Sequence, residues 1–398
     1  MSGSQSLLYH TGQVANGFSH GLPTMPGAVY YNSATMNATV KRTLYVVVIA
    51  LLTAVSGAAQ WQMQESKSTA SLRGIHAVSE RVAWASGSQG TVLRTTDGGA
   101  HWQPCAVPQG GAELDFRAVW AWDAEQAEIM SAGPGELSRR YKTTDGCASW
   151  QETGRNEDKE GFWDAMVYQS GDYGYFAVGD SHTAVMIGDP VGGRFETHVM
   201  LLGRGWFIDG KACAALPGES AFAASNSSVF VFGSRRFVMV TGGKSGARAL
   251  LSPLLWAQGS DKECLAVPLP MAGGKDSAGA FSVYFRDLKH GVTVGGDFQH
   301  PEERQGTAAY TADGGRHWTA STVPPNGYRS GVTYDVAAKR WIAVGTNGTD
   351  VSSDDGRTWQ AVDDGNWNAI SLPFVVGPKG RIGRMSPGTA ANITNAKQ

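Results

Sequence analysis

Thr95-Thr-Asp-Gly-Gly-Ala-His-Trp102 is one of four similar stretches that decide the fold. The other copies are Thr143-Thr-Asp-Gly-Cys-Ala-Ser-Trp150, Thr311-Ala-Asp-Gly-Gly-Arg-His-Trp318 and Ser352-Ser-Asp-Asp-Gly-Arg-Thr-Trp359. Each follows the pattern Ser/Thr-x-Asp-x-Gly-x-x-Trp, except that Cys147 replaces the glycine of the second copy. In such a turn the aspartate accepts amide hydrogen bonds, the glycine supplies a positive φ and the hydroxyl adds a local bond. The pattern predicts a tight turn whose tryptophan starts an outer strand and packs sideways.

These turns are interpreted as structural, since the chemistry of each residue type already accounts for its place in the turn. His101 and His317 lie inside the turns, where little supports a ligand role. The aspartates and tryptophans to which we assign this structural role are Asp97, Trp102, Asp145, Trp150, Asp313, Trp318, Asp354 and Trp359.

Self-similarity at this period predicts a propeller or a solenoid. Successive tryptophans of the pattern are 48, 168 and 41 residues apart, and the long interval fits three units better than four. The expected inner strands begin near Leu72, Phe116, Phe162, Glu219, Ala280, Tyr328 and Trp367. We therefore predict an all-β, seven-bladed β-propeller. The segment 61–65 is expected to supply the outer strand of the last blade, which would close the ring and remove free sheet edges.

The composition agrees with this fold. Of 398 residues 52 are glycine and 13 are tryptophan, which favours tight turns over helices. Lysine and arginine number 33 against 35 aspartates and glutamates, whereas a general nucleic-acid binder is usually basic. We expect no nucleic-acid partner.

The N-terminal region predicts export. Lys41-Arg42, the apolar run 44–55 and the small residues 56–59 form the pattern of a secretory signal. The run is shorter than the roughly 20 residues of a transmembrane helix, so an uncleaved anchor is the lesser alternative. We expect residues 36–59 to be the signal peptide and residues 1–35 a mis-assigned extension. The propeller then covers 60–386 and a tail covers 387–398, with no stable membrane span after cleavage and a periplasmic or extracellular location.

The mature chain keeps four cysteines, and an even number in an exported protein permits two disulfides in three possible pairings. Free, partly buried thiols are the alternative. No Cys-x-x-Cys spacing supports a metal site. The four are Cys105, Cys147, Cys213 and Cys264.

Over roughly residues 60 to 386 the chain resembles secreted Asp-box (bacterial neuraminidase repeat) propellers. It is most similar to the bacterial group that includes photosystem II assembly and stability factors, many of them labelled "oxidoreductase". Gly188-Asp-Pro-Val-Gly-Gly-Arg-Phe195, read as a degenerate Asp-box turn of the third unit, and Tyr328-Arg-Ser-Gly-Val332 carry the likeness to that group. The resemblance implies the fold, but a fold does not by itself carry a function.

The candidate site lies at the rim where the inner strands begin, which we call the start rim; the Asp-box turns lie at the opposite rim. Arg73, Arg117 and Arg329 follow the expected strand starts at corresponding positions and could bind a carboxylate. In photosystem assembly factors a similar arginine patch is thought to meet a partner protein. The alternative is that each arginine pairs with a neighbouring carboxylate. Further residues expected at this rim are Trp163, Glu136, Asp180, His182 and Asp297.

We expect a non-catalytic propeller that binds a partner protein or a small anionic ligand, without cofactor or metal. The alternative is a sialidase-like glycoside hydrolase that uses the arginines to hold a carboxylate, with Tyr334 and Glu136 available in principle. The Arg-Ile-Pro motif of that class is absent. An oxidoreductase would need a Gly-x-Gly-x-x-Gly turn in a βαβ unit, which the sequence also lacks.

Overall fold

A computed structural model describes residues 61–169, 183–191, 193–201, 206–210, 213–232, 236–252 and 264–385. The expected extension 1–35, signal 36–59 and tail 387–398 lie outside this range. Asp180 and His182 lie outside it as well. All of the described residues belong to one compact unit, Gly57–Gln398.

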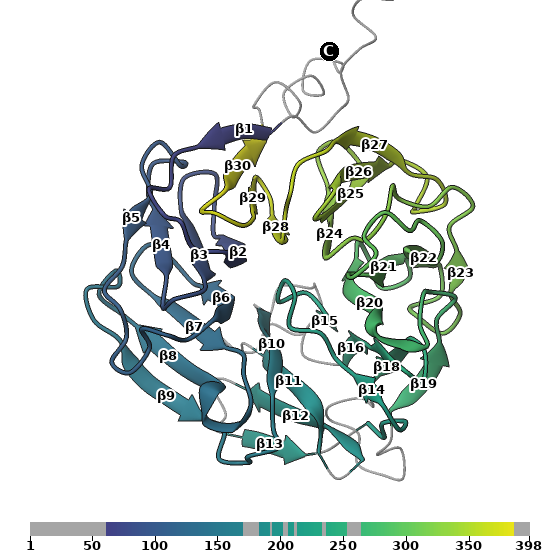
Figure 1. Cartoon of the computed structure of the whole chain (residues 1–398), viewed down its shortest axis with the longest axis horizontal. Helices are drawn as coiled ribbons and strands as arrows, with labels where there is room; N and C mark the ends of the chain where they lie inside the picture. The colour runs from purple at the N-terminus through teal and green to yellow at the C-terminus, as the bar shows by residue number, and fades with distance from the viewer. Residues whose placement is uncertain are drawn as a thin grey trace, which may run out of the picture. The chain divides into compact units, whose positions relative to one another are not determined.

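The described residues form seven antiparallel sheets, and their one helix is the 3-10 turn η1 (Gly135–Leu137). Figure 1 shows the strands, and each sheet forms the body of one blade. The sheets are listed blade by blade, from the inner strand outward. Blade 1 is β2 (Leu72–Ala77), β3 (Ala83–Gly87), β4 (Val92–Thr95) and β5 (Gln103–Pro104). Blade 2 is β6 (Phe116–Ala121), β7 (Ala127–Ser131), β8 (Arg139–Thr143) and β9 (Gln151–Arg155). Blade 3 is β10 (Trp163–Gln169), β11 (Thr183–Val191), β12 (Arg194–Leu201) and β13 (Trp206–Gly210). Blade 4 is β15 (Val229–Phe232), β16 (Arg236–Val240), β18 (Arg248–Leu251) and β19 (Leu265–Pro268). Blade 5 is β20 (Lys275–Phe285), β21 (Gly291–Asp297), β22 (Ala308–Thr311) and β23 (Thr319–Ala320), extended on its inner side by β17 (Gly242–Gly243) and β14 (Glu219–Ser220). Blade 6 is β24 (Gly331–Asp335), β25 (Arg340–Gly345), β26 (Gly348–Ser352) and β27 (Gln360–Asp363). Blade 7 is β28 (Ala369–Ser371), β29 (Phe374–Val376), β30 (Ile382–Met385) and β1 (Trp61–Gln64).

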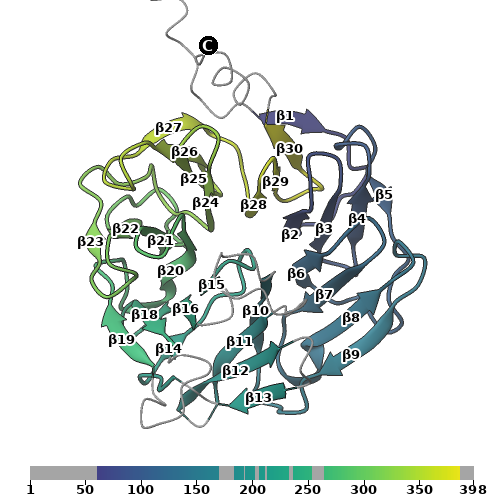
Figure 2. The ribbon, with the colours of Figure 1, turned by 180° about the vertical axis from the view of Figure 1, so that it is seen from behind.

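The inner strands contact one another in cyclic order, from β2 through β6, β10, β15, β20, β24 and β28 back to β2 (Figure 2). One hydrogen bond recurs along this cycle, from a backbone amide at the first residue of an inner strand, or two residues before it, to a glycine carbonyl of the preceding blade. Arg329 donates it to Gly295 (2.9 Å) and Trp367 to Gly345 (3.0 Å). Leu72 donates the same bond to Gly377 (3.1 Å), so blade 7 precedes blade 1 in space. The β-propeller expected from the sequence is confirmed.

The ring closes through the first described strand, as the sequence predicts. β1 pairs antiparallel with β30, from Trp61 opposite Met385 to Gln64 opposite Ile382. The indole Nε1 of Trp61 donates to Thr349 Oγ1 of blade 6 (3.0 Å). This strand covers what would otherwise be a free sheet edge.

The Asp-box turns share one set of bonds. In the first turn the amide of Gly99 donates to Thr95 Oγ1 (2.9 Å), and the amide of His101 donates to Asp97 Oδ1 (3.0 Å). The backbone amide and the ring of His101 lower the pKa of Asp97 to about 2. In the second turn the hydroxyl and amide of Ser149 lower the pKa of Asp145 to about 2. The aspartates hold these turns as charged acceptors, which agrees with a structural role.

Tryptophans of these turns pack at the boundary with the preceding blade. Trp102 is 4% exposed and meets Phe374 of blade 7 edge-on, with ring centroids 5.6 Å apart. Trp150 lies edge-on to Trp84 of blade 1 at 6.4 Å. These contacts bury apolar surface between blades, which is the main stabilising term in a fold of this kind.

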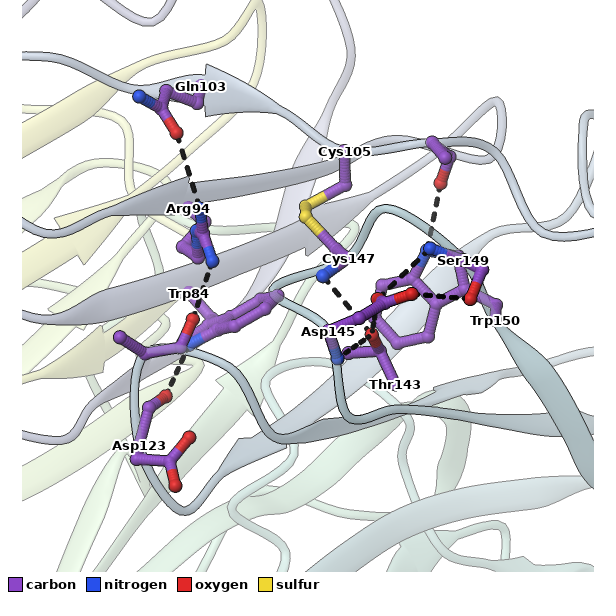
Figure 3. The surroundings of a disulfide bond; sticks show 12 residues. Trp84, Arg94, Gln103, Cys105, Asp123, Thr143, Asp145, Cys147, Ser149 and Trp150 are labelled. Carbon is purple, nitrogen blue, oxygen red and sulfur yellow. Dashed lines mark hydrogen bonds between the residues drawn. A yellow bond between two sulfur atoms is a disulfide. The ribbon is translucent and has the colours of Figure 1, made fainter.

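Two disulfides join neighbouring blades. Cys105 follows the outer strand of blade 1 and is bonded to Cys147 in the Asp-box turn of blade 2 (Figure 3). Cys213 follows the outer strand of blade 3 and is bonded to Cys264, which precedes the outer strand of blade 4. Among the described residues no cysteine is free, so the free-thiol alternative is wrong.

Two assignments in the least regular blades were wrong. The turn 188–195 is the β11–β12 hairpin, which joins a second strand to a third and so lies at the start rim instead of the Asp-box rim. The segment at Glu219 forms the short strand β14, and the inner strand of blade 4 begins ten residues later, at Val229. The residues between, 221–228, cross toward other blades and form part of the site described next.

Candidate functional site at the start rim

Arg73 and Arg117 occupy equivalent positions, but Arg329 does not share them. Leu72 pairs with Gly87 and Phe116 with Ser131, and in each blade the strand register shifts at the next residue, which is the arginine. By contrast, Arg329 donates the inter-blade bond that Leu72 donates, and it therefore corresponds to Leu72. A shift of one residue turns a strand side chain to the other face.

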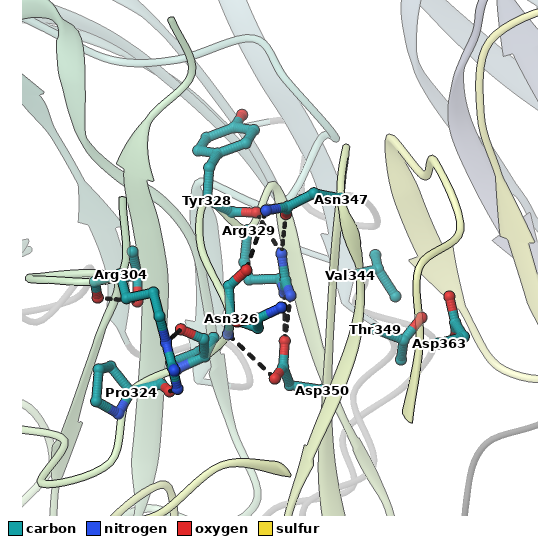
Figure 4. A network of polar contacts seen from close by, with 12 residues as sticks. Arg304, Pro324, Asn326, Tyr328, Arg329, Val344, Asn347, Thr349, Asp350 and Asp363 are labelled. Carbon is teal, nitrogen blue, oxygen red and sulfur yellow. Dashed lines mark hydrogen bonds and ion pairs between the residues drawn. The ribbon is translucent and has the colours of Figure 1, made fainter. Parts of the chain in front are cut away.

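Arg329 is consequently buried inside the propeller, with 0% of its surface exposed (Figure 4). Its guanidinium pairs with Asp350, donating from Nε at 2.7 Å and also from Nη2. Nη1 donates to the carbonyl of Tyr328 (2.7 Å) and to Asn347 Oδ1 (2.5 Å). Arg329 therefore pairs with a neighbouring carboxylate, which is the alternative stated for the arginines in the sequence analysis. Its inclusion in the ligand-binding set was wrong.

Arg117 reaches from blade 2 across the start rim. Its Nε donates to Asp115 Oδ2 (2.8 Å), and its Nη1 donates to the carbonyl of Ala223 (3.2 Å), in the segment that leads into blade 4. The side chain is 28% exposed. Asp115 Oδ1, on the other side of the same carboxylate, is buried and has no hydrogen-bond partner among the described residues.

Arg73 lies beside this pair. Burial, reinforced by the charge of Arg117, lowers the pKa of Arg73, while Asp115 and Tyr328 act in the opposite direction. Its Nε is buried without a hydrogen-bond partner in the part of the chain that the structure describes. Asp115 thus pairs with Arg117 and also acts electrostatically on Arg73, and one carboxylate can balance only one of the two positive charges. An arginine held in this way is available to bind an anion through charge-assisted hydrogen bonds.

Aromatic side chains form the other side of the same rim. The rings of Phe222 and Phe281 are stacked, with centroids 3.9 Å apart and planes 13° apart. Tyr328 meets Phe281 edge-on at 4.9 Å, and Phe298 does so at 6.1 Å. Phe298 is 46% exposed, whereas Phe281 and Tyr328 are buried. This aromatic group comes from the segment before blade 4 and from blades 5 and 6.

The segment 221–228 connects the two sides, because its bonds reach blades 2, 3, 5 and 6. In addition to the bond from Arg117, Asn226 exchanges hydrogen bonds with the backbone of Met166 in blade 3. Ser225 Oγ donates to the carbonyl of Ser330 (2.5 Å), and Ser227 Oγ donates to Ser282 Oγ (2.7 Å). The segment therefore crosses the centre of the propeller near the start rim. The sequence offered no warning of this crossing beyond the weak repeat in blade 4.

The remaining predicted residues lie apart from the arginine pair. Trp163 corresponds to Leu72 in register and is 4% exposed, so it packs inside the fold and cannot form an open platform. Glu136, on η1, pairs with Arg155 (3.2 Å). Asp297 is 2% exposed and accepts bonds from Lys275 Nζ (2.8 Å) and from the amide of Gln299 (3.0 Å). It borders a groove of about 780 Å³ beside blade 5.

The residues considered for glycosidase chemistry are not assembled into one site. Tyr334 lies toward the Asp-box end of β24, and Arg286 of the same rim lies over its ring at 6.0 Å. Glu136 lies at the start rim. Within the described ranges no cluster of three or more histidine, cysteine or acidic side chains could hold a metal ion. A search of the same residues finds no helix of sufficient length and hydrophobicity to span a membrane.

Solved structures with the same architecture include "YCF48 bound to D1 peptide", with a TM-score of 0.56 and 16% identity over 82% of this chain and 96% of that chain. The WD40 β-propeller domain of Doa1 has a TM-score of 0.51 and 10% identity, and the match covers 83% of this chain and 96% of that one. YCF48 from Cyanidioschyzon merolae has a TM-score of 0.48 and 16% identity, with 83% and 100% covered. No protein-family profile and no curated protein sequence matches the chain. At these identities the likeness shows the fold alone: the chain is a β-propeller that resembles YCF48.

Proposed function

We propose that this protein is an exported, non-catalytic propeller that binds a partner protein at its start rim, in the manner of an assembly or stability factor. The observation that carries the proposal is the pair Arg73 and Arg117. Asp115 is ion-paired with Arg117, and the buried Nε of Arg73 lacks a hydrogen-bond partner among the described residues. Buried polar atoms are normally satisfied, and a ligand is one means of satisfying them.

The likeness to a propeller solved with a bound peptide supports the choice of a protein as the ligand. An acidic segment of a partner would place a carboxylate against the two guanidiniums. Such a contact is partly screened by salt, since the Debye length is about 8–10 Å at physiological ionic strength. Affinity should therefore fall as salt is added.

The test is recovery of partners from the exported fraction with immobilised protein. The variant R73Q/R117Q removes two charges from the start rim. The matched control R81Q/R316Q removes two charges from the opposite rim, where both arginines are exposed. A partner retained by the wild type and the control but lost by R73Q/R117Q supports the proposal. Equal recovery by all three proteins, or robust hydrolysis of aryl sialosides or aryl glycosides by purified protein, would overturn it.

Export has its own test. Sequencing the N-terminus of protein secreted by the native cell should give a chain that starts near Gln60. A cytoplasmic product that begins at Met1 would contradict both the location and the role of residues 36–59.

A further inference from the structure

We infer that the start rim recognises a two-part motif in an extended segment of the partner, an acidic residue and an aromatic residue two positions further along. This inference rests on the proposed function, because the acidic residue would use Arg73 and Arg117. It adds a second subsite, centred on Phe298, which is independent of the arginine pair.

The two subsites are contiguous. Arg117 donates to the carbonyl of Ala223, and the neighbouring Phe222 is stacked on Phe281. Tyr328, which acts electrostatically on Arg73, meets the ring of Phe281 edge-on. A carboxylate at the guanidiniums therefore lies beside the aromatic group. In an extended segment the side chain two residues further along lies on the same face, at about 6.6 Å along the strand.

The aromatic group is built in place by glycines. Phe222 lies against Gly242 and Gly279, which face each other where β17 pairs antiparallel with β20. A Cβ atom at Gly242 would come within 2.6 Å of the Phe222 ring, and one at Gly279 within 2.8 Å. A larger residue at either glycine would displace the Phe222 ring from Phe281, so the close pairing of these two strands fixes the position of Phe222.

Phe298 is the member of the group that a partner can reach. Its ring is 46% exposed, and it contacts Phe281 at a centroid distance of 6.1 Å. Its amide donates to the carbonyl of Ser277 (3.2 Å), and the preceding Asp297 is bonded to Lys275 and to His300. Asp297 is therefore a positioning residue for Phe298, which gives its buried carboxylate a role at this rim without contact to the partner.

An exposed aromatic ring held against a buried one offers an edge-to-face or stacked contact to a third ring. Pairs of this kind contribute up to about 1.5 kcal/mol, which corresponds to roughly tenfold in affinity. A purely apolar occupant is excluded, because it would shield the charge of Arg73 from water and leave its Nε without a hydrogen-bond partner. The rim thus fits an acidic-aromatic motif better than either part alone.

Three synthetic peptides with blocked ends and Gly/Ser flanks test this inference. Each has one glycine between the two residues that name it: Glu-Phe is Glu-Gly-Phe, Glu-Ser is Glu-Gly-Ser and Gln-Phe is Gln-Gly-Phe. For the wild-type protein, titration calorimetry should show Glu-Phe binding about tenfold tighter than Glu-Ser, and Gln-Phe binding weakest. The variant F298S should reduce Glu-Phe to the affinity of Glu-Ser without changing Glu-Ser itself. L288S, which removes an exposed apolar side chain (71% exposed) after the inner strand of blade 5, should change none of the three affinities.

The outcomes separate the two proposals. Equal affinity of the wild type for Glu-Phe and Glu-Ser, with both lost in R73Q/R117Q, would overturn the two-part motif and leave the arginine site standing. Binding that is insensitive to R73Q/R117Q, or the absence of binding to either acidic peptide, would overturn both. A change of all three affinities by F298S and by L288S alike would assign the effect to general hydrophobicity and reject the subsite.

Discussion

Cys105 and Ser321 occupy the same position in blades 1 and 5, directly after the outer strand, and each contacts the Asp-box turn of the following blade. Ser321 Oγ donates to the carbonyl of Gly356 (2.5 Å). Cys105 is bonded to Cys147, which holds in its turn the place that Gly356 holds, with a positive φ of 67°. The disulfide is a covalent form of a contact that the propeller makes elsewhere by a hydrogen bond.

This relationship predicts a graded loss of stability. Replacement of both cysteines by serine should lower the free energy of unfolding by about 2–4 kcal/mol, because the cross-link no longer restricts the unfolded chain. The variant C105S/C147G should recover about 1 kcal/mol of that loss, since glycine adopts positive φ without strain and the serine can donate to its carbonyl. Urea denaturation measures both values. Identical stabilities of the two double variants would show that the positions are not equivalent.

Arg329 should behave as a structural residue. R329A leaves Asp350 buried without its partner, and breaking a buried pair in this way costs about 3–5 kcal/mol. The matched variant R117A removes an arginine side chain that is 28% exposed and paired with a carboxylate that is 25% exposed, and should cost less than about 1 kcal/mol. Thermal unfolding of both proteins makes the comparison. Near-native stability of R329A would refute its assignment to the core.

Trp102 and Trp318 should differ despite their identical places in the Asp-box pattern. W102A removes a side chain that is 4% exposed between blades 1 and 7, with an expected cost of about 3–5 kcal/mol. Trp318 is only partly buried against blades 4 and 5, so W318A should cost less. Chemical denaturation followed by circular dichroism gives both values. An equal or larger loss in W318A would contradict this ranking by burial.

Acid should weaken the Asp-box turns. Hydrogen bonds lower the pKa of Asp97 and of Asp145 to about 2, below the ordinary value of 3.8. A carboxylate whose pKa is lower in the folded state stabilises the fold above its unfolded-state pKa and loses that contribution as the pH falls. The melting temperature should therefore decline between about pH 4 and pH 2, and D97N, which cannot ionise, should show a shallower decline. Parallel curves for the wild type and D97N would contradict this account.

The regular part of the fold could be predicted from the sequence because each of its turns carries the same set of residues. The hydroxyl, aspartate, glycine and tryptophan of the pattern fit together in only one local geometry. Blades 3 and 4 were misassigned where that chemistry is missing. The hairpin 188–195 has glycines and an aspartate but lacks the tryptophan, and it proved to join other strands. The segment 221–228 is held by small polar side chains that bond to blades 3, 5 and 6, and such long-range contacts leave no periodic signal.

Only part of the candidate site could be predicted, because strand register and long-range packing are not visible in the sequence. Arg73 and Arg117 were identified from their spacing, but Arg329 was aligned one residue out of register. The shift of register at the arginines of blades 1 and 2 cannot be read from side-chain types. Phe298 was overlooked because a single exposed aromatic residue in a loop is unremarkable until the structure places it beside Phe281.

The pairing of β1 with β30 sets an order of events during synthesis. Trp61 and Met385 face each other in one sheet, although more than three hundred residues separate them. A growing chain can assemble blades 1 to 6 from neighbouring segments, but β1 has no strand to pair with until residues 382–385 have left the ribosome. Until then Trp61 lacks its contacts with blade 7, and β29 has a free edge with which another chain could pair. Completion of the fold thus waits for the last strand, and truncation before residue 382 would leave β1 and β29 without the strand that joins them in one sheet.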